Sequence, residues 1–66
     1  MQIELNGIPK TITEPMTVAG LLQDLTIPLA SVVVELNKTI LQPDSYATTL
    51  FKNIDHVELI RFVGGG

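Results

Sequence analysis

Residues 2–7, Gln-Ile-Glu-Leu-Asn-Gly, form the stretch that decides the fold. Polar and apolar residues alternate through Leu5, with the period of two that is typical of a half-buried β-strand. Asn6-Gly7 follows and is the strongest short-range hairpin signal, because a type I′ turn needs positive φ at both central residues. Residues 8–13 are predicted to return as the second strand, with Ile8 and Ile12 as its apolar residues. Pro9 places that strand at an edge, since proline has no N–H to donate to a ladder.

A short amphipathic helix is predicted after the hairpin. Thr17 is suited to cap its N-terminus, because its hydroxyl can accept a hydrogen bond from the first turn. Gly20 lies inside the helix and either permits a close approach to the sheet or is simply tolerated. Pro28 ends the helix by the preceding residue at the latest. The apolar face follows the i, i+3, i+4, i+7 spacing with Val18, Leu21, Leu22 and Leu25.

Residues 31–36 are the most strand-like stretch, because they contain three consecutive valines. We expect them to form a central strand that is covered on both faces for part of its length. Asn37-Lys38 predicts a turn, and Ile40-Leu41 predicts a short strand after it. Residues 43–46 are suited to a turn or a single helical turn, and Leu50 and Phe51 are expected to pack beneath this region.

Residues 56–63 are predicted to form the last strand, with Val57, Leu59, Arg61 and Val63 on one face. The strand leads into Gly64-Gly65-Gly66, which holds three of the five glycines in the chain. Glycine has no Cβ, so such an arm can enter a slot that is too narrow for any side chain. We expect residues 1–61 to form the domain, and residues 62–66 to form a flexible tail with a free carboxylate on Gly66.

The composition indicates one small domain and excludes several classes of function. The chain has 66 residues, of which 45% are hydrophobic, and a formal net charge of −3. Its four basic residues are scattered, so nucleic-acid binding is not expected. The absence of cysteine excludes a thiol nucleophile and a thiolate metal site, and it agrees with a reducing, cytoplasmic setting. Neither a membrane span of about 20 apolar residues nor a signal peptide is expected.

The other polar residues are expected to have structural roles rather than catalytic or metal-binding ones. His56 is the single histidine, so it lacks the companions of a zinc site or a nucleophile to activate, and we expect a surface residue. Asp55 and Glu58 should diverge to opposite faces rather than form a carboxylate pair. Glu4 and Glu35 are expected on solvated strand faces. Tyr46 is expected to cap the core, and no metal site is predicted.

The order of elements predicts an α+β fold. A hairpin, a crossover helix and a valine-rich strand suggest a mixed sheet of four to five strands with one helix packed across one face. If the last strand lies beside the first, both ends of the domain are paired in the middle of the sheet.

Several short motifs resemble those of the ThiS family, the sulfur carriers of thiamine biosynthesis. This resemblance implies a ubiquitin-like β-grasp fold, and it runs along the whole chain. The terminal glycines are its most specific part. The matching pieces are Thr17-Val18, Leu21-Leu22, Val34-Glu35-Leu36-Asn37, Asp55-His56-Val57-Glu58 and Phe62-Val63-Gly64-Gly65-Gly66.

The resemblance implies a co-substrate protein rather than an enzyme. An activating enzyme similar to ThiF would bind ATP and adenylate the Gly66 carboxylate, so the chain itself would bind no cofactor. A sulfur donor protein would then convert it to a thiocarboxylate, and a thiazole synthase similar to ThiG would take the sulfur. Gly65 and Gly64 would thread the partner's channel, and Val63 and Phe62 would lie where the strand becomes the arm.

Three alternatives remain open on the sequence. The chain also resembles the small subunit of molybdopterin synthase, although the 66-residue length and the Phe-Val-Gly-Gly-Gly ending favour the thiamine family. It would otherwise be another ubiquitin-like sulfur carrier or modifier, or a β-grasp protein-binding module with an inert tail. Phe62 is either a core aromatic at the end of a strand or an interface residue.

Overall fold

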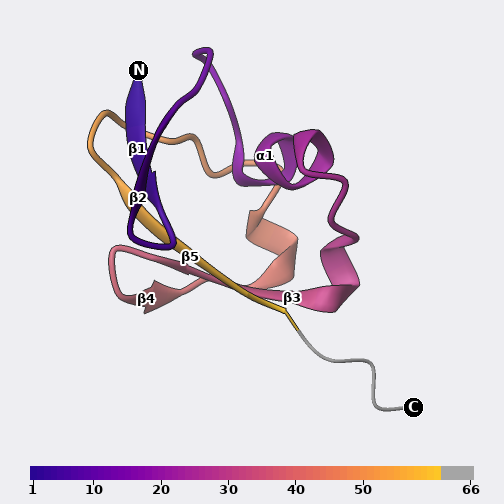
Figure 1. Cartoon of the computed structure of the whole chain (residues 1–66). Helices are drawn as coiled ribbons and strands as arrows, with labels where there is room; N and C mark the ends of the chain where they lie inside the picture. The colour runs from indigo at the N-terminus through magenta and orange to yellow at the C-terminus, as the bar shows by residue number, and fades with distance from the viewer. Residues whose placement is uncertain (62–66) are drawn as a thin grey trace.

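A five-stranded mixed sheet with one helix across one face makes up the computed structural model, which describes residues 1–61 (Figure 1). The strand order is β2-β1-β5-β3-β4, in which only β1 and β5 are parallel. The first and last strands are therefore neighbours, and the predicted α+β β-grasp topology is confirmed. The elements are β1 (Gln2–Leu5), β2 (Ile8–Thr11), α1 (Val18–Asp24), η1 (Leu29–Ser31), β3 (Val32–Leu36), β4 (Thr39–Ile40), η2 (Pro43–Ser45) and β5 (His56–Arg61).

The β1–β2 hairpin confirms the opening prediction. Asn6 and Gly7 both have positive φ, at 51° and 82°, as a type I′ turn requires. The strand β2 lies at the edge of the sheet, which is where Pro9 is tolerated. It ends at Thr11 rather than at residue 13. Of its two predicted apolar residues, Ile8 follows the turn on the edge strand and is 68% exposed, whereas Ile12 is buried.

The helix α1 begins as predicted. Thr17 Oγ1 accepts a hydrogen bond of 3.0 Å from the Gly20 amide, so Thr17 is the N-cap. A Cβ on Gly20 would lie 3.3 Å from that hydroxyl oxygen and 3.6 Å from Met16 Cγ. The close neighbours of Gly20 therefore belong to the cap, and the alternative of a close approach to the sheet is wrong. The buried face of the helix consists of Val18, Leu21 and Leu22.

The end of α1 is a Schellman motif rather than a proline stop. The Ile27 amide donates to the Leu22 carbonyl at 2.8 Å, and the Thr26 amide donates to the Gln23 carbonyl at 3.0 Å. Thr26 has φ 55°, the left-handed conformation that this motif demands at its position. The helix thus stops at Asp24, before Pro28 could end it.

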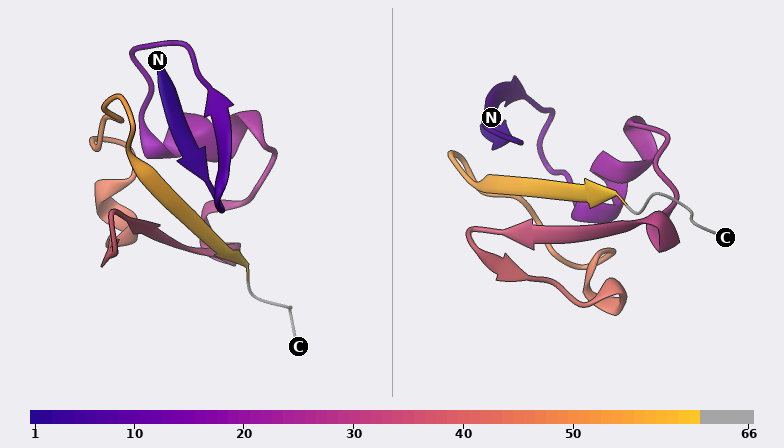
Figure 2. Two further views of the ribbon diagram at one scale, coloured as in Figure 1. Left: turned by 60° about the vertical axis from the view of Figure 1, so that its left-hand side comes forward. Right: turned by 60° about the horizontal axis from the view of Figure 1, so that its bottom comes forward.

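The core lies between α1 and the sheet (Figure 2). Tyr46 is only 2% exposed and is part of this core rather than a cap at its edge. Leu50 is 53% exposed, so its predicted packing is wrong, whereas the prediction for Phe51 is confirmed. Neighbouring residues of an extended segment face opposite ways, and Phe51 takes the inner side here. The buried apolar residues are Ile3, Ile12, Val18, Leu21, Leu22, Val32, Val34, Tyr46, Phe51 and Val57.

The second half of the sheet follows the predicted order with two differences. Asn37 and Lys38 form the expected turn, with φ 50° and 69°, and η2 is the expected helical turn. The short strand β4 begins one residue earlier than predicted. β3 has neighbours on both sides, but β5 takes the centre of the sheet because it pairs with both β1 and β3. Within residues 1–61, no helix is long and apolar enough to cross a membrane.

Candidate functional site

The predicted site residues, Phe62, Val63, Gly64, Gly65 and Gly66, lie outside the residues that the structure describes. The division into a domain of residues 1–61 and a tail of residues 62–66 therefore stays a prediction. The structure describes the strand that leads to this segment. β5 is the central strand, so the sheet determines where Arg61 is placed.

The two flanks of β5 are held unequally along its length. On one side, β3 pairs with it over five residues, from Val57 to Arg61. On the other side, β1 pairs only with His56 and Val57 before it enters the hairpin turn. Beyond Val57, the Asn6 side chain replaces the backbone of β1 as a hydrogen-bond partner of β5. Its Oδ1 accepts a hydrogen bond of 2.8 Å from the Leu59 amide. The last residues of β5 thus run past the hairpin, beside β3 (Figure 2).

The start of β5 is tied down by a buried carboxylate. Asp55 is 9% exposed, and its Oδ2 accepts from the Lys52 amide at 2.7 Å. Its Oδ1 accepts from Asn37 Nδ2 at 3.0 Å, while Asn37 Oδ1 accepts from the His56 amide at 2.9 Å. One polar network therefore joins the β3–β4 turn to the beginning of β5. The divergence predicted for Asp55 and Glu58 holds, since Glu58 is exposed.

The sequence did not reveal the structural role of Asp55 and Asn37. The turn signal at Asn37 was visible, but its partner lies 18 residues further along the chain. Only the pairing of β3 with β5 brings the two side chains together. No local pattern could have indicated this contact.

An apolar hollow lies near the end of β5 that leads to the tail. Its volume is about 460 Å³, and η1, β3, β4 and η2 contribute to its walls. Val32, which pairs with Arg61, is one of its lining residues. Ile40 in the same wall is 60% exposed, and Ile60 on the open face of the sheet is 51% exposed. The end of β5 at Arg61 therefore lies close to exposed apolar surface, which is typical of protein interaction sites.

The face of the sheet opposite α1 is acidic as well as apolar. Glu35 and Glu58 lie directly across from each other on β3 and β5. Like charges in this arrangement repel and destabilise the pair. His56 is a surface residue, as predicted, and its Nδ1 lies 3.1 Å from Glu4 Oε2. Among residues 1–61, no group of three or more His, Cys, Asp or Glu side chains is arranged to hold a metal ion.

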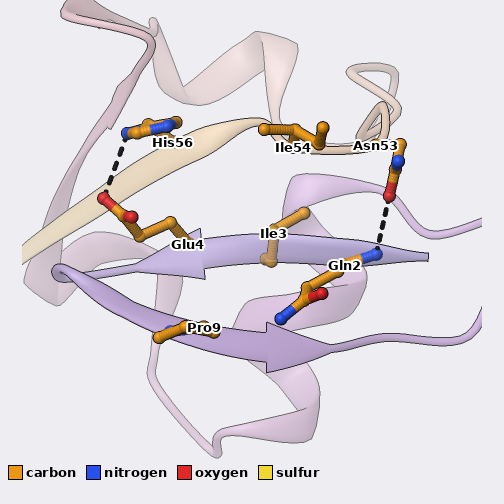
Figure 3. A pocket seen from close by; sticks show the side chains of 7 residues that line it. All are labelled: Gln2, Ile3, Glu4, Pro9, Asn53, Ile54 and His56. Atoms are coloured by element: carbon orange, nitrogen blue, oxygen red, sulfur yellow. Dashed lines mark hydrogen bonds and ion pairs between the residues drawn. The ribbon is translucent and has the colours of Figure 1, made fainter.

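A second hollow lies on the same face, at the start of β5. Its volume is about 340 Å³, and Figure 3 shows that β1, β2 and the loop before β5 supply its walls. Glu4 reaches from β1 toward His56 on one side of it, and Asn53 accepts a hydrogen bond from the Gln2 amide on another. Pro9 and Ile54 supply apolar walls. Among residues 1–61, the side chains that line this open hollow include no serine, threonine, cysteine or lysine that the Glu4–His56 pair could activate as a nucleophile.

The chain matches the model of the ThiS family over residues 3–66. It is 38% identical to the crystal structure of a thiamine biosynthesis protein (ThiS) from Geobacter metallireducens. The alignment covers 100% of both chains with a TM-score of 0.83. The solution structure of a thiamine biosynthesis protein from the same organism gives a TM-score of 0.82, also at 38% identity, and covers 100% of this chain and 88% of that one.

Curated relatives fall into two groups by length. A thiazole synthase of Magnetococcus marinus is 35% identical over 66 residues, which are 100% of this chain and 20% of that protein. This chain thus spans about a fifth of that relative's length, and a thiazole synthase of Paramagnetospirillum magneticum gives the same figures. An uncharacterized protein, ycf40, of Porphyra purpurea is 33% identical and is covered over 93% of its length.

Proposed function

Because this chain belongs to the ThiS family, we propose that it is a sulfur carrier of thiamine biosynthesis that holds sulfur on the carboxylate of Gly66. The observation that carries the proposal is the family match over residues 3–66, since it includes the glycine run as well as the domain. The relatives named for thiamine biosynthesis support the same role. The chain would act as a co-substrate rather than as an enzyme.

The proposed chemistry explains why the carboxylate must be activated. A carboxylate is a poor electrophile because it already carries a negative charge. Its oxygen would attack the α-phosphorus of ATP on an activating enzyme similar to ThiF, and pyrophosphate would leave. The terminal sulfur of a persulfide on the donor protein would then attack the acyl carbon and displace AMP. A second thiol would cleave the sulfur–sulfur bond, so that the thiocarboxylate is released and a disulfide is formed.

The fold supports this cycle by presenting the tail. β5 lies at the centre of the sheet and its last residue, Arg61, still pairs with β3, so the base from which the following residues start has a defined position. Exposed Ile40 and Ile60 offer apolar surface beside that base. Gly64 and Gly65 would pass through a narrow channel of the partner, since neither has a side chain. Phe62 and Val63 would contact the mouth of that channel.

The proposed acceptor is a thiazole synthase similar to ThiG. Two curated thiazole synthases contain a stretch equivalent to this whole chain within one longer polypeptide. Such a fusion keeps a carrier close to the enzyme that consumes its sulfur, which raises the effective concentration of the two parts. We further propose a cytoplasmic location, because activation consumes ATP.

An intact-mass measurement tests the proposal. The purified chain is incubated with ATP, a sulfur source and the activating enzyme of the same organism, and its mass is then determined. We expect a gain equal to the replacement of one oxygen by sulfur, located on Gly66 by fragmentation. Absence of the gain, with an activating enzyme shown to adenylate a known carrier, would contradict the proposal.

The matched control is a variant with one alanine appended after Gly66. The added residue moves the carboxylate away from the reacting position and leaves the sequence of residues 1–61 unchanged. We expect no mass gain and an unchanged melting temperature. If the extended chain still accepts sulfur on its terminal carboxylate, the position of that carboxylate is not what the activating enzyme reads.

A further inference from the structure

Ile54 combines three properties that together raise the question of why this position holds an isoleucine. Its φ is 71°, in the left-handed region that β-branched residues strongly avoid. Its side chain is 70% exposed, which is the highest value among the exposed large apolar side chains of residues 1–61. It also forms a wall of the 340 Å³ hollow at the start of β5. Backbone strain of this kind is concentrated at functional sites.

The backbone position itself has a clear structural purpose. The Ile54 amide donates to the Gln2 carbonyl at 2.6 Å, and the Asp55 amide donates to the Lys52 carbonyl at 3.1 Å. This tight turn seats the loop against β1 and aims Asp55 into its buried network. Glycine or asparagine would adopt the same φ with less strain. The turn therefore explains the conformation but not the choice of isoleucine.

Exposure shows that the isoleucine side chain contributes little to the core. At 70% exposed, it removes little of its apolar surface from water when the chain folds. In a domain of 66 residues, whose stability is small, a strained residue without a compensating contact is a disadvantage. A compensating contact with another protein would account for it.

We infer that Ile54 and the hollow beside it form a second docking point for the thiazole synthase, separate from the tail. This inference rests on the proposed function and adds the surface that recognises the acceptor. Ile54 would enter an apolar depression of the partner, and a partner lysine or arginine would lie over the hollow against Glu4. Figure 3 shows how the two are placed, with Ile54 and the Glu4 carboxylate on the same side of β1.

Charge favours a basic group as the occupant of the hollow. Glu4 is its only acidic lining residue, and His56, its neighbour at 3.1 Å, carries a full positive charge only when protonated. The chain as a whole has a net charge of −3. Pro9 provides an apolar surface on which the stem of a long basic side chain could lie. A lysine or arginine therefore fits both the charge and the shape.

Distance explains why this contact can select the partner. His56, which lines the hollow beside Ile54, precedes Ile60 by four residues on the same face of β5, which is about 13 Å along the strand. An enzyme that takes up the tail must cover most of the open sheet face to reach Ile54 as well. Two enzymes must accept the same tail in turn, so a contact far from the tail can distinguish them. The thiazole synthase is the one that relatives join to this domain in a single chain.

The test compares Ile54→Asn with Thr26→Asn in the full chain. Both changes replace an exposed β-branched residue at positive φ, but Thr26 lies at the end of α1, away from the open sheet face. We expect each to raise the melting temperature by about 4 °C through relief of strain. Calorimetric titration with the thiazole synthase of the same organism should show at least about fivefold weaker binding for Ile54→Asn and no change for Thr26→Asn. Binding of the activating enzyme should change for neither.

A charge variant tests the other half of the contact. Glu4→Gln should weaken thiazole synthase binding about threefold at low salt and reduce its dependence on ionic strength. Asp24→Asn, at the exposed end of α1, is the control and should leave both unchanged.

Three results would overturn the inference. The first is wild-type affinity of Ile54→Asn for the thiazole synthase, and the second is weakened binding to the activating enzyme alone. The third is a lower melting temperature of Ile54→Asn and Ile54→Gly, which would show that the isoleucine serves the fold. The mass assay on the unaltered chain tests the sulfur-carrier role independently of the docking point at Ile54. If that chain gains sulfur while Ile54→Asn binds normally, the carrier role stands and the docking point does not exist.

Discussion

The two ends of β5 differ in how they are held, although they belong to one six-residue strand. The start is fixed from both sides, by the Asp55–Asn37 network and by hydrogen bonds between the preceding loop and Gln2. The end at Arg61 pairs with β3, while β1 has already turned away. The difference shows how a small domain can anchor one end of its central strand and leave one flank of the other end unpaired. Rigidity is concentrated where the strand begins, and access is left where it ends.

The substitution expected to lower the stability of the anchored end of β5 the most is Asp55→Ala. The change leaves Asn37 Nδ2 and the Lys52 amide without their acceptor in a poorly hydrated site. We expect a loss of about 3 kcal/mol in the free energy of unfolding, measured by urea denaturation. Asp55→Asn, which keeps one acceptor oxygen, should recover part of that loss. A loss below about 0.5 kcal/mol for Asp55→Ala would show that the start of β5 is not the anchored end.

At the other end, Gly65→Val should affect function rather than stability. If the tail passes through a narrow channel, a branched side chain will block it. We expect the rate of activation to fall at least about 100-fold, equivalent to about 2.7 kcal/mol in the barrier. The rate is measured as ATP–pyrophosphate exchange by the activating enzyme. Stability should remain within about 0.5 kcal/mol of the unaltered chain. Normal activation would remove the argument for a narrow channel.

Asn6→Gly tests the single side-chain contact that replaces β1 beside Leu59. Glycine keeps the positive φ of the turn but removes the acceptor of the 2.8 Å hydrogen bond. We expect a loss of about 1 kcal/mol in the free energy of unfolding. Asn6→Ala should lose more, because it adds backbone strain to the lost bond. Faster hydrogen exchange confined to the Leu59 amide in Asn6→Gly would locate the effect at the open flank. Unchanged exchange there would mean that another group protects this amide.

The smallest expected effect is a gain in stability from Glu58→Gln. This change removes the repulsion between Glu58 and Glu35, which face each other across β5 and β3. We expect about 0.5 kcal/mol of added stability at low ionic strength and a smaller gain at high salt. Thermal unfolding at two salt concentrations measures both values. A gain that is independent of salt would point to packing rather than to charge.

Local turn and cap chemistry accounts for most of what the sequence predicted correctly. The two turns and the helix cap form through groups only a few residues apart, so they can be recognised without knowledge of the fold. They are Asn6-Gly7, Asn37-Lys38 and Thr17. The errors fall where a side chain's surroundings depend on distant segments. Leu50 is an apolar residue in an extended segment, but its exposure depends on which distant segments cover it. The position of β5 at the centre depended on a pairing between the two ends of the chain.

The candidate site divides in the same way. The glycine run of residues 64–66 is evident in the sequence, because the freedom of a glycine backbone belongs to the residues themselves, whereas its role in the chemistry stays a prediction. The buried role of Asp55, the open flank beside Leu59 and the hollow next to Ile54 were not evident. Each of these joins segments that are far apart in the chain, so no local pattern predicts it.

By itself, the sequence determined the hairpin, the helix cap and the apolar face of the helix. These follow from turn propensity, capping and periodicity, all of which act at short range. Tertiary structure alone decided which strand is central, which carboxylate is buried and which apolar side chains remain exposed. Those outcomes depend on contacts between residues that are more than 50 positions apart in the sequence. Only the folded chain brings such partners together.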